Sequence, residues 1–370
     1  MRNLLIITQK VDENDDLLGF FVGWLKEFAK KFNKVFVITL AKGDYELPDN
    51  VFVYSLGKEK YANSAPPPYG SGNPNALIRI ISKFVYLFRF YKILFKFVPK
   101  SSGVFCHMSP IFAIASWPAA FIFRKRIILW YLHRSVTLRL KLAEKIAYKI
   151  ATAAKESLNL KSRKIVELGH GIDIEKFKFE RKFDDFSSRP IEILSVGRIS
   201  KIKDYETLIK TARILKDRGL DFNLKIVGRP IMSYDFDYFE KLKKLIQELK
   251  LENFIEFAGF IPYSRITDYY RKSNIFINLA PDGGIDKVVL EAMVSGCIIF
   301  TSNQAFRKYI QDYEILFFEH GNSEELAQKV ITISEISSDK IREIQQRLFD
   351  SVSSHHNFAA LIGKISSLYG

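Results

Sequence analysis

The chain has 370 residues, 48% of them apolar, and a formal net charge of +15 at pH 7. This length is too great for one ordinary core and suits two domains, and the apolar content excludes disorder as the default state. The two cysteines, Cys106 and Cys297, lie far apart in apolar runs, which excludes a disulfide framework and indicates a reducing compartment.

The N-terminal run MRNLLIITQK is too short for the apolar region of a signal peptide and lacks a small-residue cleavage site, so it predicts a first strand. Charges interrupt every long apolar stretch before it reaches the length of a membrane span. We therefore expect a cytoplasmic protein, either soluble or peripheral on the inner face of the membrane. Residues 1–185 contain 31 Lys or Arg against 17 Asp or Glu, which indicates that this half faces a membrane or a nucleic acid.

The first elements of the chain predict an α/β unit with a parallel sheet. Residues 4–8 form an apolar strand, residues 22–32 an amphipathic helix and residues 34–40 a second strand. Strand, helix and strand in this order make a βαβ unit. The first loop is acidic and contains Gly19, and it lies either near a bound acceptor or on plain surface.

Residues 61–76 are rich in Pro, Gly, Ser and Asn and predict an exposed loop. The next segment, residues 76–100, has six basic residues and no acidic one, with aromatic residues and leucines between them at near-helical spacing. One face of this helix is expected to pack on the sheet, but the aromatic residues exceed what one face requires. A basic aromatic helix is typical of contact with an anionic membrane surface. No nucleic-acid motif accompanies the charge, so we expect no nucleic-acid partner.

Two further predicted strands each have a histidine at or just after their carboxyl end, at the same edge of the predicted sheet. The first ends at His107, and the second, residues 127–131, is followed by His133. Open parallel sheets bind ligands at the carboxyl ends of their strands, so both are candidates, although a lone histidine there is more often structural. A charged linker predicts the domain boundary near residues 179–190.

The second domain opens with a buried strand, residues 191–196, which is followed by Arg198 and Lys203 on a short loop. Two cations at the carboxyl end of a strand suit a diphosphate, and a guanidinium can bind it with two hydrogen bonds. The alternative for an isolated pair of this kind is a solvated basic loop.

Residues 281–300, PDGGIDKVVLEAMVSGCIIF, predict a turn at Gly283 and Gly284, then a helix and a short buried strand. A glycine turn before a helix directs unpaired amides and the positive end of the helix dipole to one spot, which suits phosphate. Glu291 in the early turns of the helix could accept hydrogen bonds from a ribose, although an early-helix glutamate is usually there for the dipole. An anion site beside this carboxylate indicates a nucleotide ligand.

Four ordered pieces of the chain together resemble one family. They are the strand WYLH ending at His133, the VGR-x4-K segment with Arg198 and Lys203, the FAGFIP segment around Gly259, and LEAMVSG with Glu291. This order resembles the retaining GT-B glycosyltransferases of family 4, also described as glycosyl transferases group 1. The C-terminal half carries the specific part of the resemblance.

The resemblance implies an α/β protein of GT-B fold, with two Rossmann-like domains whose parallel sheets face each other across a cleft. Residues 1–180 would bind the acceptor and residues 190–345 would bind the nucleotide sugar. The last helix, predicted over roughly residues 339–369, would cross back to the first domain with residues 346–370. The implied reaction is transfer of a sugar, with retention, from a nucleoside diphosphate sugar to an acceptor hydroxyl. The basic, aromatic first half favours a lipid-linked or envelope-polysaccharide acceptor.

The resemblance also implies roles for single residues. Arg198 and Lys203 would neutralise the leaving diphosphate, which makes a divalent metal unnecessary, and no carboxylate pair of the D-x-D kind suggests otherwise. Glu291 would position the ribose and His133 the donor sugar.

Weaker matches to the same family imply substrate contacts at three further positions. Gly19 is the one glycine left of a first loop that reaches toward the donor diphosphate. His107 matches a second, less regular histidine, and the backbone from Gly259 to Ile261 would lie near the base.

One departure concerns the first glutamate of the family's E-x7-E pattern, because Gly283 stands in its place. Asp286 is the preferred partial replacement, and Lys287 beside it could hold a phosphate oxygen. The loss leaves a second function open, a sugar-nucleotide-binding protein without catalysis. A nucleotide-sugar epimerase is a third, less favoured alternative.

Overall fold

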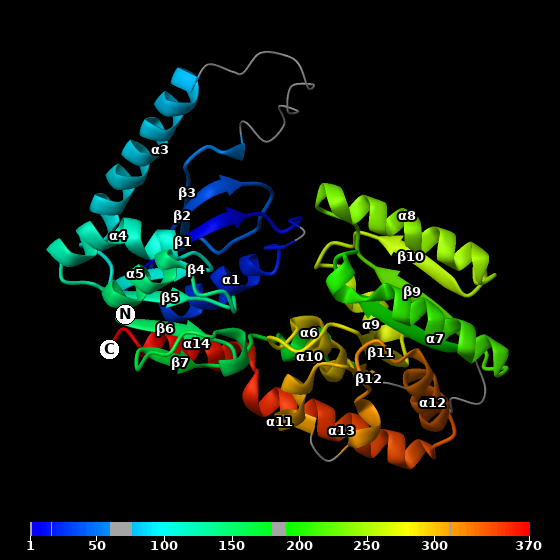
Figure 1. Ribbon diagram of the computed structural model, residues 1–370. Helices are drawn as coiled ribbons and strands as arrows, with labels where there is room; N and C mark the ends of the chain where they lie inside the picture. Colours follow the sequence, from blue (N-terminus) through cyan, green and yellow to red (C-terminus); the bar gives the residue numbers. More distant parts are fainter. Residues whose placement is uncertain (1, 16, 60–75, 180–189, 311–312) are drawn as a thin grey trace. The chain divides into compact units, whose positions relative to one another are not determined.

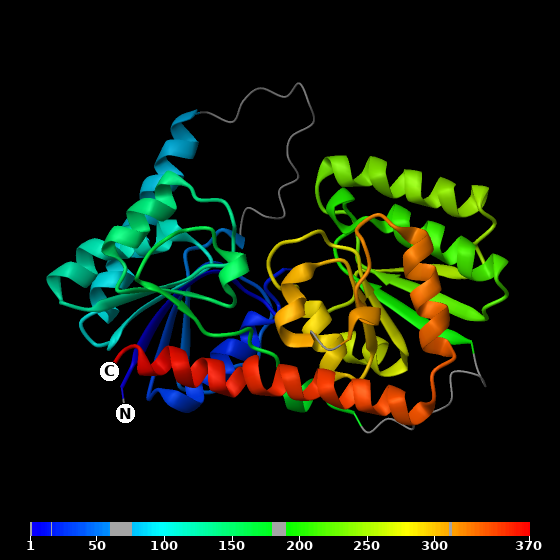
Figure 2. The same ribbon diagram turned by 60° about the horizontal axis from the view of Figure 1, so that its bottom comes forward.

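The structure, a computed structural model, describes residues 2–15, 17–59, 76–179, 190–310 and 313–370, with the side chains of 76–84 excepted. The chain forms two compact units (Figures 1 and 2). Unit 1 comprises Met1–Leu168 with Ala359–Gly370, and unit 2 comprises Gly169–Phe358. Most of the segment predicted as a linker, residues 179–190, lies outside the described residues.

Unit 1 is built on a seven-stranded parallel sheet in the order β3-β2-β1-β4-β5-β6-β7. The predicted parallel α/β architecture of this half is therefore confirmed. The strand order reverses between β1 and β4, which are neighbours in the sheet. The strands are β1 (Leu4–Val11), β2 (Val35–Lys42), β3 (Val51–Ser55), β4 (Gly103–His107), β5 (Arg126–Trp130), β6 (Lys149–Thr152) and β7 (Ile165–Glu167).

Helices cover both faces of this sheet because every strand carries apolar side chains on both sides. Side chains of α3, α4 and α5 share one core cluster with alternate residues of the strands, such as Val104 and Cys106. On the opposite face α1 packs Trp24 and Phe28 against Phe105. The helices are α1 (Phe21–Lys31), α3 (Ala76–Phe97), α4 (Pro110–Ile122) and α5 (Leu138–Ile146), with a 3-10 turn at Lys155–Ser157.

None of the helices in the described residues combines the length and the apolar character that crossing a bilayer requires.

Unit 2 has a five-stranded parallel sheet in the order β10-β9-β8-β11-β12. Its strands are β8 (Ile191–Val196), β9 (Phe222–Val227), β10 (Ile255–Gly259), β11 (Ile275–Asn278) and β12 (Ile298–Thr301). Its helices are α6 (Ile174–Phe177), α7 (Tyr205–Asp217), α8 (Ser233–Glu248), α9 (Ile266–Lys272), α10 (Lys287–Val294), α11 (Arg307–Ile310), α12 (Ser323–Ser334) and α13 (Ser338–His355). Short 3-10 turns lie at Lys201–Lys203, Gln304–Phe306 and Glu314–Leu316.

The prediction of one helix over residues 339–369 is wrong, because the structure has two. α13 ends at His355, and α14 (Phe358–Ser367) begins three residues later. Between them the chain pairs with Ile172: the amide of Ile172 donates to the His356 carbonyl, and the amide of Phe358 donates to the Ile172 carbonyl. Backbone groups bonded in this way are not available to continue a helix.

The C-terminal residues 359–370 belong to the core of unit 1. Leu361, Ile362 and Ile365 of α14 are buried, and Tyr369 lies over the start of β4. A Cβ atom on Gly103 would be 2.5 Å from the Tyr369 ring and 2.6 Å from the Arg126 carbonyl oxygen. Gly103 is therefore the residue that permits this close approach.

We expect Gly103→Ala to lower the free energy of unfolding of unit 1 by about 1–3 kcal/mol, because the added methyl group overpacks the Tyr369 contact. Gly363→Ala is the matched control, since a Cβ atom there meets nothing within 4 Å and the site is helical. It should instead stabilise by about 0.5–1 kcal/mol. Urea unfolding followed by tryptophan fluorescence measures both, and equal stability of the two variants would contradict the described packing.

Candidate active site

The carboxyl ends of β8 and β11 define a candidate ligand site in unit 2. These strands are neighbours, although the chain visits β9 and β10 between them, so their loops diverge at a topological switch point. Open parallel sheets bind ligands at such points. The loop after β8 carries Arg198 and Lys203, and the loop after β11 carries Gly283, Gly284 and Asp286.

Lys203 and Asp286 join these two loops. The Lys203 Nζ atom lies 2.8 Å from the Asp286 Oδ2 atom, and the Asn278 side-chain amide donates to the same oxygen over 2.8 Å. Asn278 is the last residue of β11, and its own oxygen accepts from the Thr301 hydroxyl at 3.1 Å. Since Asn278 and Thr301 are buried, they fix the position of Asp286 from below.

Arg198 is held at this site through its backbone. The amide of Gly197 donates to Val227, and the amide of Ile199 donates to the Arg229 carbonyl, so the loop lies against the loop after β9. Gly228 makes this approach possible, because a Cβ atom there would lie 1.9 Å from the Gly197 carbonyl oxygen. The Arg198 side chain is half-buried.

The start of α10 leaves its amides without a side-chain cap. Asp286 is the N-cap residue, but its carboxylate is turned to Lys203 and makes no hydrogen bond to the amides of the first turn. The preceding turn is tied to the chain after β12, since Asp282 accepts from the Gln304 amide at 2.7 Å and the Gly284 carbonyl accepts from Asn303 at 2.9 Å. The Val289 amide donates to the Asp286 carbonyl at 3.2 Å, and the positive end of the helix dipole at this point suits an anion.

Glu291 lies on the same helix but in different surroundings. Its side chain is buried, and its two oxygens accept hydrogen bonds from the Tyr263 and Tyr270 hydroxyls, each over 3.1 Å. The Lys287 Nζ atom is 3.5 Å from the same carboxylate and donates to the Tyr263 oxygen at 3.1 Å. The structure therefore brings the predicted residues Glu291 and Lys287 together as an ion pair in which Glu291 is buried and Lys287 is partly exposed.

Burial explains the charge states in this network. Burial beside the Glu291 carboxylate raises the pKa of both Tyr263 and Tyr270 well above the usual value, so both hydroxyls keep their protons and donate. Burial also lowers the pKa of Lys287, an effect that the attraction of Glu291 opposes. The ribose contact that the sequence predicts for Glu291 would require at least one of these partners to move.

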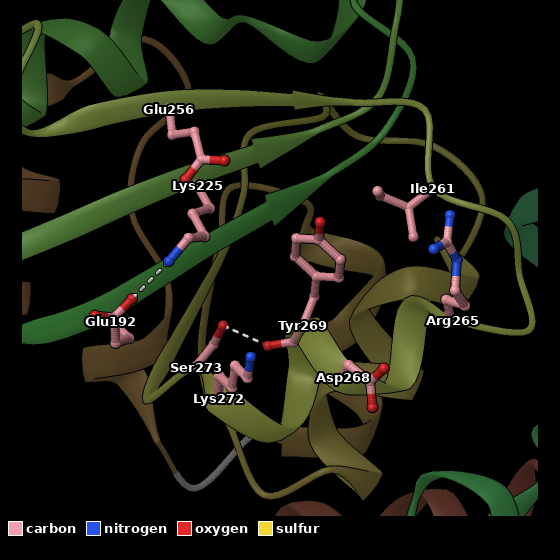
Figure 3. A pocket seen from close by; sticks show the side chains of 9 residues that line it. All are labelled: Glu192, Lys225, Glu256, Ile261, Arg265, Asp268, Tyr269, Lys272 and Ser273. Carbon is pink, nitrogen blue, oxygen red and sulfur yellow. Dashed lines mark hydrogen bonds and ion pairs between the residues drawn. The ribbon is translucent and has the colours of Figure 1, made fainter.

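A pocket of unit 2, of about 340 Å³, lies beside α9, apart from Lys203 and Asp286 (Figure 3). Ile261, from the segment predicted to lie near the base, lines one part of it. Its other side chains carry charges of both signs, and Lys225 lies 3.3 Å from Glu192, the second residue of β8. This pocket therefore follows the face of the sheet rather than its carboxyl edge, and its mixed charge does not favour a diphosphate. Gly259, with φ of 70°, ends β10, and its carbonyl accepts from the Gly228 amide at 2.8 Å.

In unit 1 the acidic first loop is folded on itself. Lys10 forms ion pairs with Asp12 and Asp15 over 2.8 and 2.9 Å, and Asp15 also accepts from backbone amides. Gly19 is buried under this loop, and a Cβ atom on it would lie 2.7 Å from the Glu13 carbonyl oxygen. Glycine at this position thus permits close backbone packing.

The two candidate histidines of unit 1 have opposite environments. His133 follows β5 and is exposed, beside the Tyr131 ring. His107 is fully buried: its ring stacks on Phe21 with centroids 3.9 Å apart, and Nδ1 lies 3.2 Å from the Thr8 hydroxyl. Burial lowers the pKa of His107 to about 3, so the ring is neutral. No atom of His107 is exposed, so the side chain cannot contact a substrate. His107 is a core residue of unit 1.

Sequence reasoning missed four residues of the site, namely Tyr263, Tyr270, Asn278 and Thr301. Asn278 ends the apolar strand β11, and an amide at the carboxyl end of a buried strand is itself a signal for a ligand or a network. The two tyrosines carry no signal in the sequence, because the contact with Glu291 depends on how α9 packs on α10.

Two parallel α/β units with a cation-bearing switch point in the second define the GT-B fold that the sequence predicted. The crystal structure of Alr3699/HepE from Anabaena in complex with UDP and glucose matches with a TM-score of 0.73 over 99% of both chains, at 16% identity. At this identity the likeness is one of fold. The family model described as glycosyl transferases group 1 matches residues 176–347, which lie in unit 2.

Curated relatives match over part of their length. The amylovoran biosynthesis glycosyltransferase AmsK of Erwinia amylovora is 28% identical over 176 residues, 45% of this chain and 42% of AmsK. The N-acetylgalactosamine-N,N'-diacetylbacillosaminyl-diphospho-undecaprenol 4-alpha-N-acetylgalactosaminyltransferase of Campylobacter jejuni is 27% identical over 193 residues, 51% of this chain and 48% of that enzyme. The chain thus spans about half the length of these relatives.

We expect the stability of unit 1 to fall as the pH drops below about 6.5, because the unfolded chain then protonates His107 and the folded chain does not. The fall in the free energy of unfolding should steepen below pH 6.5 and approach about 1.4 kcal/mol per pH unit near pH 5. All three tryptophans lie in unit 1, so their fluorescence in urea follows this unit. His107→Asn keeps a partner for Thr8 but does not titrate, and its slope should be smaller; equal slopes would refute the assignment.

We expect Glu291→Ala to lower the free energy of unfolding of unit 2 by about 3 kcal/mol, since the buried Tyr270 hydroxyl, the part-buried Tyr263 hydroxyl and Lys287 lose their acceptor. Glu291→Gln keeps an acceptor oxygen and should lose less. Chemical unfolding followed by far-UV circular dichroism measures both variants. A Glu291→Ala variant of unchanged stability, with weaker nucleotide binding, would instead make this carboxylate a ligand contact.

Proposed function

We propose that the protein is a retaining glycosyltransferase that moves a sugar from a nucleoside diphosphate sugar to an acceptor hydroxyl. The observation that carries the proposal is the meeting of Lys203 and Asp286 at the switch point of unit 2, beside Arg198 and the uncapped start of α10. The match of residues 176–347 to the glycosyl transferases group 1 family model supports it.

In this proposal the diphosphate of the donor binds between Arg198, Lys203 and the first amides of α10. The reaction is difficult because negative charge develops on the leaving diphosphate as positive charge builds on the sugar ring. Fixed cations and helix-end amides stabilise that charge without reorganising, and no divalent metal takes part. When the phosphate oxygens bind Lys203, Asp286 exchanges its ammonium partner for a sugar hydroxyl while it keeps the hydrogen bond from Asn278.

Several residues act around this centre in the proposal. His133 orients the donor sugar, and Glu291 either contacts the ribose or holds Lys287 and the start of α10 in place. The backbone at Gly259 lies near the base. UDP is the first nucleotide to test, because the HepE structure of the same fold holds UDP and glucose.

The acceptor that we propose is a lipid-linked or envelope glycan. One relative is named for transfer to a diphospho-undecaprenol-linked sugar and another for amylovoran biosynthesis. The high positive charge of unit 1 supports an acceptor of this class, since the diphosphate of such a carrier is anionic.

A second candidate function rests on Gly283, which stands where the family resemblance expects a glutamate. A protein that lacks this carboxylate would bind the sugar nucleotide without transferring the sugar. The two functions differ in turnover: both require nucleotide binding, but only the transferase releases nucleoside diphosphate with an acceptor glycan.

We expect Arg198→Ala and Lys203→Ala each to lower the transfer rate by about 10²–10³-fold, because each removes one charge that stabilises the leaving group. Lys201→Ala is the matched control, an exposed lysine on the same 3-10 turn, and should retain the rate. The measurement is release of nucleoside diphosphate from UDP-, GDP- and ADP-sugars, with calorimetry of UDP, GDP and ADP binding. The site assignment would be overturned if both variants keep nucleotide binding and turnover. If the unaltered protein binds a nucleotide but shows no turnover of any donor, the second candidate function is favoured.

A further inference from the structure

We infer that the outer face of unit 1 formed by α3, α4 and α5 docks onto an anionic lipid membrane. The inference goes beyond the sugar transfer and does not depend on it, because no residue of the unit 2 site takes part. It extends the membrane surface predicted from residues 76–100 to two further helices.

α4 is the centre of this face. Its sequence, PIFAIASWPAAFI, contains no charged residue. Phe112, Ala113 and Ala120 are buried in the core cluster, while Trp117 and Phe121 point outward and Phe121 is 69% exposed. A helix that is apolar all round is normally buried on both sides, and here the sheet covers only one.

A groove of about 500 Å³ lies at the carboxyl end of α4. Trp117, Phe121 and Ile122 supply apolar walls, and Arg124 and Lys125 stand beside them. The Trp117 and Phe121 rings lie against each other with centroids 5.3 Å apart. Aromatic side chains next to cations suit the boundary between acyl chains and anionic headgroups.

The neighbouring helices extend the same kind of surface. Phe88 of α3 is 72% exposed, and Leu138 at the start of α5 is 83% exposed. Phe95 of α3 meets Phe123, which directly follows α4, with ring centroids 6.2 Å apart. In Figure 1 α3, α4 and α5 gather on one side of the sheet of unit 1.

The charge of this face indicates what binds to it. Residues 76–146, which include these three helices, contain thirteen Lys or Arg and one acidic residue, Glu144. A second copy of the chain on the same face would bring two basic surfaces together and be repelled. An anionic bilayer instead attracts them, and each basic residue near the surface adds to binding. Apolar side chains at this density, among charged residues that are nearly all basic, therefore fit an anionic membrane better than a protein partner.

The chain provides its own reporter for the test. Trp24 and Trp130 are buried and Trp117 is exposed, and these are the three tryptophans of the chain. Mixing the full chain with vesicles of phosphatidylcholine and phosphatidylglycerol in equal parts should shift the emission of Trp117 to the blue. Vesicles of phosphatidylcholine alone should give a weaker shift, and high salt should weaken binding because the attraction is screened.

Vesicle co-sedimentation of variants tests the surface directly. The double variant Trp117→Ala, Phe121→Ala should lower the partition coefficient by about tenfold or more. The charge variant Arg124→Glu, Lys125→Glu leaves the apolar side chains in place and should lower it by a similar factor, about tenfold. The matched control is Tyr234→Ala, Phe236→Ala, two exposed aromatic residues on α8 of unit 2, which should bind like the unaltered chain.

Each outcome decides the inference. Weaker binding of both unit 1 variants, with unchanged nucleotide binding and an unchanged far-UV spectrum, supports it. Failure of the unaltered chain to bind anionic vesicles, or equal binding by all variants, overturns it and leaves the proposed transfer untouched. Loss of a dimer in sedimentation velocity when Trp117 and Phe121 are removed, without loss of vesicle binding, would assign the face to a second copy instead.

Discussion

One ion pair, between Lys203 and Asp286, closes the switch point of unit 2. Its two side chains are 21% and 28% exposed, so the pair itself adds little to stability and is easily rearranged. The pair matters because its carboxylate has a fixed position. Asn278 at the buried end of β11 donates to Asp286, and Thr301 at the end of β12 donates to Asn278. An anionic ligand can therefore replace Asp286 at the ammonium group while the carboxylate stays in place, still bonded to Asn278. The cation thus lies beside the start of α10, and in the proposed reaction neither group has to move far when a diphosphate binds.

The two carboxylates of this region differ because one helix turns them in different directions. Asp286 stands at the N-cap of α10, and Glu291 follows five positions later, which places it well round the helix axis. There Tyr263, Tyr270 and Lys287 satisfy it inside the unit, so this carboxylate binds α9 to α10. A buried carboxylate that lacks such partners would not remain charged. The arrangement keeps the start of α10, and hence the amides that face the anion site, in a fixed position.

Features that depend on residues close together in the sequence could be predicted from the sequence. Strand–helix–strand patterns predicted both parallel sheets, and the spacing of Arg198 and Lys203 after a buried strand predicted their common loop. Features that depend on distant packing were missed. His107 ends a strand as predicted, but its side chain points to the face that Phe21 and Trp24 of α1 cover, and alternation along a strand does not say which face is covered. The break between α13 and α14 likewise depends on Ile172, far away in the chain.

Charge divides the chain in the same way as structure does. Residues 186–370 are nearly neutral, with 25 Lys or Arg against 24 Asp or Glu, while residues 1–185 carry almost the whole excess. A site for a dianionic leaving group needs only a few well-placed cations, because a low-dielectric pocket strengthens each one. A membrane surface is different: its potential is spread over many headgroups and is screened within about 10 Å, so it requires many basic residues at the surface. The excess of positive charge on the half of the chain that also exposes Trp117, Phe121 and Leu138 is therefore better explained by a broad anionic surface than by the binding of a single nucleotide.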